Sequence, residues 1–256
     1  MKYIDLHTHS KYSGDSDFSV KEIIDCAIKK KLKVIAITDH NTISGLKEAL
    51  EYFNRKIILI PGIEISCWDK NLENIDIHVL GLFIDWKNKK LNELYYKLYK
   101  RKTLVNIAKF VIESNIRLKK AAKLVYKKLK LIVNKLTKKE PTMKEAIKMI
   151  KNAGGVAILA HPGIYLNKTD KILERFIELG GQGLEVHYPY DKLYDFDRKL
   201  TKKVINKIKK IAVKNKLVIS GGSDFHGGKR KVELGDEGLS EKEFEKIRKL
   251  FKKFLK

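Results

Sequence analysis

Two histidines stand close together near the start of this chain, in the stretch "DLHTHS". His7 and His9 are separated by one residue, and side chains repeat with a period of two in extended backbone, so both imidazoles point to the same side. Imidazole and carboxylate groups together suit Zn, Mn and Fe ions. The spacing therefore indicates that the two rings bind one metal ion.

The other five histidines also fall within or just after short β-branched segments. They occur in "ITDH", "DIHVLG", "LAHPG", "LEVHYP" and "GGSDFH", as His40, His78, His161, His187 and His226. In a parallel barrel the carboxyl ends of the strands open on one face, where such folds hold their active sites. A lone histidine is more often a surface or hydrogen-bonded core residue, but all seven histidines of this chain share one pattern. We therefore predict that the set binds metal.

Three carboxylates are candidate ligands beside these imidazoles. Glu64, in "PGIEIS", lies just beyond a predicted strand end and could bridge two ions. Asp224 precedes His226 by two residues, so alternation aims both side chains the same way. Asp15 follows the His-x-His loop, where Asp17 competes with it and a turn or cap role is the alternative.

Two further aspartates are expected to support the site rather than bind metal. Asp5 lies two residues before His7 and could hold an imidazole in place from behind. Asp39 is next to His40, and we expect it either to point away from the site or to play a similar supporting part.

Seven strands alternate with helices in the predicted secondary structure. The strands are expected near residues 2–6, 33–38, 57–61, 76–83, 156–160, 183–186 and 217–220, and the helices near 19–30, 44–54, 142–153, 169–179, 195–214 and 241–255. Ser19 with Glu22 and Thr142 with Glu145 form capping-box patterns. This alternation indicates βα units and a parallel sheet, and seven strands in 256 residues favour a closed barrel.

The net charge of +24 is concentrated in one segment. Residues 86–140, between the fourth and fifth predicted strands, contain eighteen Lys/Arg and three Asp/Glu and are expected to form two or three helices. A Lys-rich composition can reflect solvated helix faces of a heat-adapted protein. It can also produce a positive field that gathers a polyanionic substrate. The sequence leaves both interpretations open.

Composition indicates the class of protein. The chain has no apolar run near 18 residues and no basic-then-apolar leader pattern, so we expect no contact with a membrane. Cys26 and Cys67 are too few and too isolated to suggest a disulfide framework. We expect a soluble, cytoplasmic protein, and the sequence does not set its oligomeric state.

The ordered motifs of the chain resemble those of the PHP (polymerase and histidinol phosphatase) domain family. "DLHTHS", "ITDHNT", "PGIEIS", "HVLGLFI", "LAHPG" and "GGSDFHG" occur in family order from residue 3 to about residue 235. The resemblance implies an α/β fold, a distorted (β/α)7 TIM-like barrel. It implies one PHP domain over residues 1–256 with 86–140 as a basic helical cap. Members of the family carry two or three metal ions and hydrolyse phosphoesters, and the mixed imidazole and carboxylate donors of this chain suit divalent Zn, Mn or Fe.

The resemblance also implies which residues hold the ions. The first position would use His7, His9, Glu64 and Asp224, the second Glu64, His78 and His161, and the third Asp15, His40 and His226. His187 matches a position that is often not histidine in the family, and it could face the substrate phosphate. Such ions would activate a water molecule for attack on phosphorus, with Glu64 between two of them. A protonated imidazole, from either His187 or His226, could then protonate the leaving oxygen.

Within the family, the stretch "PTMKEAIKMIKNAGGVAILAHPG" most resembles small stand-alone members. Some of these hydrolyse nucleoside 3′,5′-bisphosphates, and others trim RNA from the 5′ end. Candidates for gripping a second phosphate are Arg101, Lys102, Lys229 and Arg230, although each is more often a solvated surface charge. Base-stacking candidates are Tyr95, Tyr96 and Tyr99, although helical spacing more often indicates packing. The insertion lacks the Gly-Arg-Pro-His stretch usual in those relatives, so the resemblance does not extend to those contacts.

Three functions are compatible with these observations. The first is a metal-dependent phosphoesterase acting on a phosphomonoester or phosphodiester of a nucleotide or short RNA or DNA. The second is a small-molecule phosphatase of the histidinol-phosphate type, which has less need of a basic insertion. The third is a nucleic-acid-binding module with weak or no catalysis, which has no need of a full ligand set.

Overall fold

Seven strands form one mixed sheet in this computed structural model, which describes residues 3–52, 56–73, 75–91, 93 and 140–250. The strands pair in chain order: β1 (Ile4–Asp5), β2 (Val34–Ile37), β3 (Ile58–Cys67), β4 (Ile77–Leu82), β5 (Val156–Leu159), β6 (Gly183–His187) and β7 (Val218–Gly221). The predicted α/β class is confirmed. Residues 94–139, most of the predicted Lys-rich insertion, lie outside the described residues.

The strand β4 runs against its neighbours, so the prediction of an all-parallel sheet is wrong there. β4 pairs antiparallel with both β3 and β5, whereas the other four pairings are parallel. Cys67 at the end of β3 is opposite Ile77 at the start of β4, and Leu159 at the end of β5 is opposite Val79. The start of β4, which carries His78, therefore lies at the same edge as the ends of β3 and β5.

β3 is twice as long as predicted because it changes partner midway. Its first half, up to Pro61, pairs with β2, and its second half, from Gly62, pairs with β4. Added side-chain volume at Gly62 would meet Thr38 at 2.7 Å, so the strands approach closely at this change. Glu64 was predicted to lie just beyond the end of this strand. It lies inside β3 instead.

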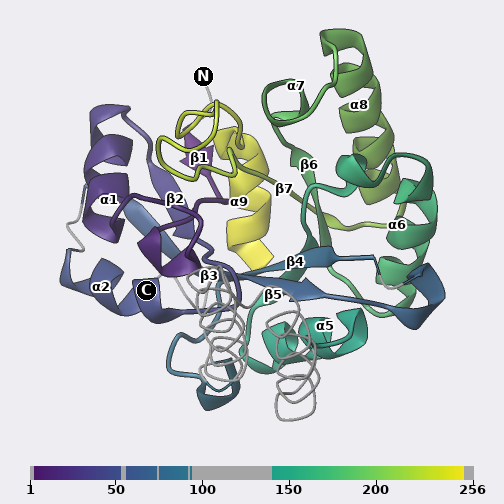
Figure 1. Cartoon of the computed structure of the whole chain (residues 1–256), viewed down its shortest axis with the longest axis horizontal. Helices are drawn as coiled ribbons and strands as arrows, with labels where there is room; N and C mark the ends of the chain where they lie inside the picture. The colour runs from purple at the N-terminus through teal and green to yellow at the C-terminus, as the bar shows by residue number, and fades with distance from the viewer. Residues whose placement is uncertain (1–2, 53–55, 74, 92, 94–139, 251–256) are drawn as a thin grey trace, which may run out of the picture.

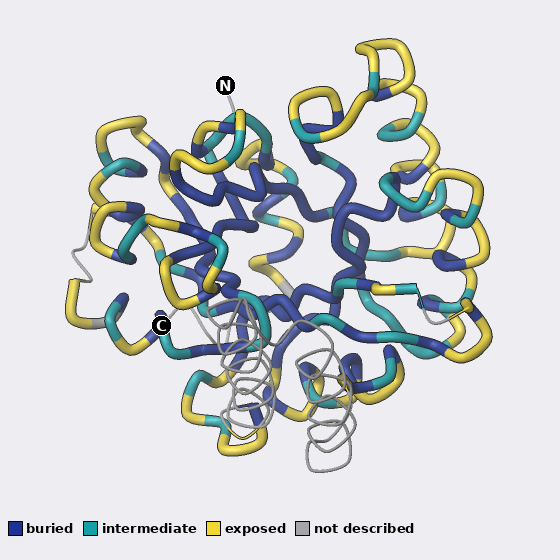
Figure 2. The backbone as a smooth tube through the Cα atoms, viewed as in Figure 1, coloured by how far each residue is buried: buried dark blue, intermediate teal, exposed yellow. Residues whose placement is uncertain are grey.

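Helices cover the outer face of the sheet. They are α1 (Val20–Lys29), α2 (Ser44–Glu51), α5 (Met143–Asn152), α6 (Thr169–Glu178), the short α7 (Tyr190–Leu193) and α8 (Arg198–Lys214), with 3-10 turns at Lys11–Ser13, Lys70–Leu72 and Pro162–Lys168. Both predicted capping boxes are present, at the starts of α1 and α5. Alternation along β2 divides the core, because Ile35 and Ile37 pack toward these helices. Figure 2 shows the buried strands enclosed by exposed helix surfaces.

The last described helix, α9 (Glu241–Leu250), packs against the other face of the sheet. Phe244 and Ile247 belong to a second buried cluster with Val34, Ala36 and further inward-facing strand residues. Figure 1 shows α9 in yellow between β1 and β7. β1 and β7 are the first and last strands of the sheet. They are linked where the amide of Leu6, just after β1, donates a hydrogen bond to the Gly221 carbonyl over 3.1 Å.

No helix in the described ranges is both long and apolar enough to cross a bilayer. Cys26 and Cys67 are free thiols, in agreement with the expectation that the chain has no disulfide framework.

Candidate metal centre

The buried carboxylate of Glu64 is surrounded by imidazoles. Its Oε2 lies 3.3 Å from Nε2 of His7, 3.3 Å from Nε2 of His9 and 3.0 Å from Nδ1 of His40, while its Oε1 lies 3.1 Å from Nδ1 of His78 and 3.1 Å from Nε2 of His161. Five imidazoles from the ends or starts of four strands thus surround one carboxylate, which a fifth strand, β3, carries. The two oxygens of Glu64 face different imidazoles, as a bridging ligand requires.

Asp224 and Asp15 complete the cluster on two sides. Oδ1 of Asp224 lies 3.4 Å from Nε2 of His7 and 3.2 Å from Nε2 of His9. Oδ2 of Asp15 lies 3.4 Å from Nε2 of His40 and 3.3 Å from Nε2 of His226. The structure therefore brings all nine sequence-predicted ligands into one cluster, although they are distributed over more than 200 residues of chain.

Several buried atoms of this cluster make no hydrogen bond of acceptable geometry, although some of them lie close to one another. They are Nε2 of His7, His9 and His226, Nδ1 of His40 and His161, Oε2 of Glu64 and Oδ1 of Asp15. Leaving such an atom unpaired costs about 1–3 kcal/mol, so a folded protein rarely keeps many of them together. Divalent cations would satisfy these imidazole and carboxylate atoms at once, and the donor set suits Zn, Mn or Fe.

Three groups of ligand atoms lie close enough to share an ion. Within each group the atoms are no more than 4.8 Å apart; the groups are His9, Asp15, His40 and His226; His7, His9 and Asp224; and His40, Glu64 and His78. This grouping overlaps the one implied by the family resemblance. It differs in that His9 also approaches the third position, His40 takes the place of His161 in the second, and Glu64 is not grouped with the first.

Burial and the neighbouring charges set the ionisation of the cluster. Burial alone would raise the pKa of Glu64, but attraction to His7, His40 and His78 holds that pKa well below its usual range. Burial, together with repulsion from His226 and His40, lowers the pKa of His9 to about 4. His9 is therefore neutral near pH 7, which is the form that binds metal.

Two site residues have left-handed backbone. His161 has φ 30° and Asp224 has φ 53°, a region that costs an L-residue on the order of 1–3 kcal/mol. Such strain gathers at functional sites, because the surrounding structure must hold a side chain in a required direction. Here it aims the His161 ring at Glu64 and the Asp224 carboxylate at His7 and His9.

Glu185, which was not among the predicted site residues, supports the cluster. Its Oε1 lies 3.0 Å from Nδ1 of His7, and its Oε2 accepts a hydrogen bond of 2.7 Å from the His161 amide. A carboxylate on Nδ1 fixes the tautomer and leaves Nε2 free to bind metal. The available signal was an acid among the apolar residues of "GLEVH", two positions before His187.

Asp5 differs from its predicted role. It was expected to hold an imidazole, but it accepts hydrogen bonds from the Ser223 hydroxyl at 2.5 Å and from the amides of Ser223 and Gly235 at 2.9 Å each. It thus fixes the loop that precedes Asp224. Close packing brings Ser223 within reach of Asp5, since added volume at Gly222 would meet the His7 amide at 2.4 Å and Oδ1 of Asp5 at 2.8 Å.

The other two aspartates also bind loops. Asp39 accepts a hydrogen bond of 2.6 Å from the Ser10 amide and one of 2.8 Å from its hydroxyl, the supporting role that was one of its two predicted alternatives. Asp17 accepts a hydrogen bond of 3.1 Å from the Gly228 amide. The competition between Asp15 and Asp17 is therefore resolved in space, because only Asp15 contacts the imidazoles in the described structure.

The predicted substrate contacts are placed less uniformly. Nη1 of Arg230 donates to Oδ2 of Asp224 over 2.5 Å, at the edge of the cluster, and Lys229 beside it is exposed. Nε2 of His187 lies 3.0 Å from Oε1 of Glu243 on α9. Other candidates, namely Arg101, Lys102, Tyr95, Tyr96 and Tyr99, lie outside the described residues.

Comparison with known proteins decides the family. Residues 5–220 match the PHP domain family, a range that contains all seven strands except the first residue of β1 and the last residue of β7. The chain belongs to the PHP domain family. As a PHP protein it is similar along most of its length to relatives with different named activities.

Two of these relatives act on different phosphoesters. A phosphoribosyl 1,2-cyclic phosphate 1,2-diphosphodiesterase from Eggerthella lenta is 27% identical, covering 87% of this chain and 94% of the relative. The 5′-3′ exoribonuclease Rnm from Escherichia coli is 28% identical, covering 90% and 87%. A solved Bifidobacterium adolescentis structure, named as a metal-dependent phosphoesterase, shares the fold with a TM-score of 0.71 and 22% identity, covering 96% and 95%.

The contact between Glu185 and His7 predicts a selective effect on metal binding in this PHP protein. Glu185→Ala is expected to weaken metal affinity by about 10–100-fold, because Nδ1 of His7 loses its partner. Glu185→Gln keeps an oxygen acceptor and should recover most of that affinity. Isothermal titration with Mn²⁺ or Zn²⁺ measures both. Equal affinities for Glu185→Ala and the wild type would show that Glu185 does not position His7.

Proposed function

We propose that this PHP protein is a metal-dependent phosphoesterase that hydrolyses a phosphomonoester or phosphodiester of a nucleotide or short oligonucleotide. The convergence of six imidazoles and three carboxylates with unpartnered, buried ligand atoms supports this proposal most strongly. A protein that only binds nucleic acid has no need of such a cluster, whose polar burial and backbone strain are costly to maintain.

We assign the cluster to two or three ions. The first would be held by His7, His9, Glu64 and Asp224, the second by Glu64, His78 and His161, and the third by Asp15, His40 and His226. When bound, divalent ions would lower the pKa of a coordinated water and neutralise the phosphoryl oxygens. Glu64 would serve both of the first two positions, because one of its oxygens faces His7 and His9 and the other faces His78 and His161.

The remaining residues would orient the phosphate and move the proton. The Arg230 side chain is 34% exposed and already binds one carboxylate of the cluster, so its guanidinium can reach a phosphoryl oxygen at the rim, with Lys229 beside it. For the proton on the leaving oxygen we propose His187, which is linked to Glu243, or His226. His226 could serve only when the third position holds no ion, because an imidazole binds metal in its neutral form.

The proposed architecture is a distorted TIM-like barrel in a single domain over residues 1–256. The Leu6–Gly221 hydrogen bond and the parallel bridge between Thr8 and Phe225 support closure between β1 and β7. A basic cap over residues 86–140, carrying Arg101, would cover the site that binds the anionic substrate. The positive charge suits a polyanionic substrate. Both named relatives act on phosphoesters of ribose compounds, in agreement with this substrate class.

A substrate panel tests the proposed function. Purified protein with Mn²⁺ or Zn²⁺ is assayed against adenosine 3′,5′-bisphosphate, 5′-phosphorylated RNA, histidinol phosphate and p-nitrophenyl phosphate. We expect kcat/KM for the bisphosphate or the RNA to exceed that for histidinol phosphate by about a hundredfold, or about 3 kcal/mol of transition-state binding. Preference for histidinol phosphate would favour a small-molecule phosphatase, and no turnover of any compound would favour a binding module.

A further inference from the structure

The helix α8 has a charge pattern unlike that of the other helices. Its basic residues, all exposed, are Arg198, Lys199, Lys202, Lys203, Lys207, Lys209, Lys210 and Lys214, and the helix contains no acidic residue. The other described α-helices of eight or more residues all contain acids, some of them paired within the helix. Examples are Lys21 with Asp25 in α1 and Arg175 with Glu178 in α6. A Lys-rich composition alone therefore does not explain α8.

Most of these cations have no carboxylate partner. Within the described ranges, Lys207 pairs with Asp170 and Lys209 lies 3.7 Å from Glu243, and these are the ion pairs of α8. Like charges three and four residues apart repel each other along a helix. A polyanion lying along α8 would convert this repulsion into attraction.

A line of aromatic rings connects the metal centre to the start of α8. The Tyr188 hydroxyl donates to Oδ2 of Asp224 over 2.9 Å. The ring of Tyr194 lies 6.4 Å from that of Tyr188 and 6.4 Å from that of Phe196, which is two residues before the helix begins. Tyr194 is 41% exposed, so a base that leaves the centre could stack on it.

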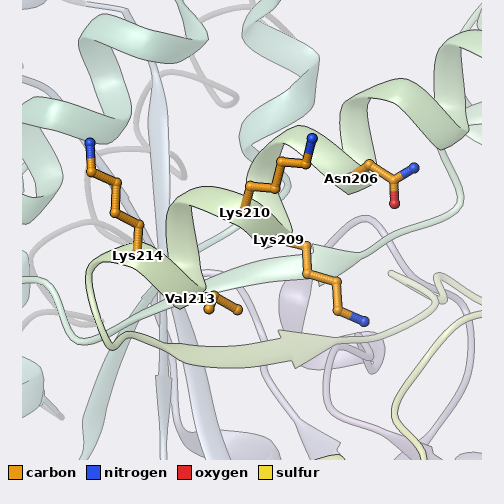
Figure 3. A pocket seen from close by; sticks show the side chains of 5 residues that line it. All are labelled: Asn206, Lys209, Lys210, Val213 and Lys214. Carbon is orange, nitrogen blue, oxygen red and sulfur yellow. The ribbon is translucent and has the colours of Figure 1, made fainter.

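The second half of α8 borders a shallow hollow of about 360 Å³. It is lined by Asn206, Lys209, Lys210, Val213 and Lys214, and Figure 3 shows Lys209 projecting on the opposite side from Lys210 and Lys214. An adjoining pocket shares Lys209 and Val213 and adds Lys216, Lys246 and one acid, Glu243. Lysines therefore outnumber acids past the end of the helix toward α9.

We propose that Tyr194 and α8 bind the phosphate backbone of a single-stranded nucleic acid whose end occupies the metal centre. This inference rests on the proposed function and specifies its substrate as a strand several nucleotides long. Seventeen residues of helix span about 25 Å, enough for several phosphates. An anionic membrane fits less well, because an interfacial helix presents Trp, Phe or Leu. The exposed large apolar residues of α8 are Leu200 and Val213, which are too few to form such a face and include no aromatic ring.

Charge removal on two matched surfaces tests the inference. One variant replaces Lys202, Lys203, Lys210 and Lys214 with glutamine; its control replaces Lys144, Lys148, Lys151 and Lys171, which are exposed on α5 and α6. Affinity for a 5′-phosphorylated RNA of about twenty nucleotides and for a dinucleotide is measured across salt concentrations. Each phosphate contact to a single strand contributes about 0.7 to the salt slope, so the α8 variant should lose up to about 3.

The expected result is specific to the long strand. The α8 variant should lose at least about tenfold more affinity for the long RNA than for the dinucleotide, while the control keeps most of both. Tyr194→Ala should also weaken RNA binding, by about tenfold, whereas Tyr52→Ala, at a tyrosine that is 40% exposed, should not.

Several outcomes would overturn the inference. They are equal losses in the two lysine variants, unchanged RNA binding in the α8 variant, or loss of binding to anionic vesicles with RNA binding intact. Hydrolysis of adenosine 3′,5′-bisphosphate and of 5′-phosphorylated RNA by the wild-type protein with Mn²⁺ reports on the metal centre separately. Turnover of either compound with RNA affinity independent of α8 would contradict this inference alone, and absence of turnover of both would contradict the proposed function.

Discussion

Replacing Glu64 with glutamine is expected to reduce phosphoester hydrolysis by at least about a thousandfold, with little change in the fold. Glutamine has nearly the same shape, but it lacks the charge and the second oxygen that contact five imidazoles. Neither of the two ions assigned to this carboxylate would then be held. The measurement is kcat/KM for adenosine 3′,5′-bisphosphate, together with the metal content of the variant.

Glu73→Gln is the matched control for this experiment. Glu73 is exposed and pairs with Lys168 away from the cluster, so its variant should keep the wild-type rate and metal content. Circular dichroism and the melting temperature check that Glu64→Gln stays folded. A Glu64→Gln protein with most of the wild-type rate would contradict the bridging role.

Removal of metal is expected to abolish activity and to destabilise the protein together. A ligand present at a thousand times its Kd stabilises the folded state by about 4 kcal/mol. For a chain of this length that corresponds to a fall in Tm of about 10 °C after chelation. The unpartnered imidazole nitrogens and the clustered carboxylates of the centre are the physical reason, because they lose their shared cations.

Differential scanning fluorimetry with and without chelator measures this effect, and added Mn²⁺ or Zn²⁺ should restore both Tm and activity. Asp224→Ala supplies the control, since a protein with a damaged centre should show a smaller shift on chelation. A wild-type Tm and rate that both ignore the chelator would contradict the presence of a metal centre.

Local rules predicted the parts of the fold that depend on neighbouring residues. Period-two alternation correctly placed His7 and His9 on one side, and capping boxes marked the starts of α1 and α5. The reversal of β4 was not predictable in this way, because it depends on pairing between Gly62 and Leu82, twenty residues apart. The change of partner within β3 has the same origin, and it moved Glu64 into the strand.

The residues of the site also differ in how far the sequence predicts them. Its ligands were found because histidine is rare in this chain and follows one pattern, whereas Glu185 is one acid among many and shows its role only where His7 and His161 meet it. Asp5 was assigned to an imidazole because they are close in sequence. In the structure it binds Ser223, which is more than 200 residues away along the chain.

The metal content of the protein as purified, without added metal or chelator, tests the central claim most directly. Elemental analysis combined with native mass spectrometry gives the identity and the number of ions per chain. We predict two or three ions of Zn, Mn or Fe per chain, and a clear loss of them in Glu64→Gln. A wild-type protein that holds no such ion, even after incubation with Mn²⁺ and Zn²⁺, would contradict the account.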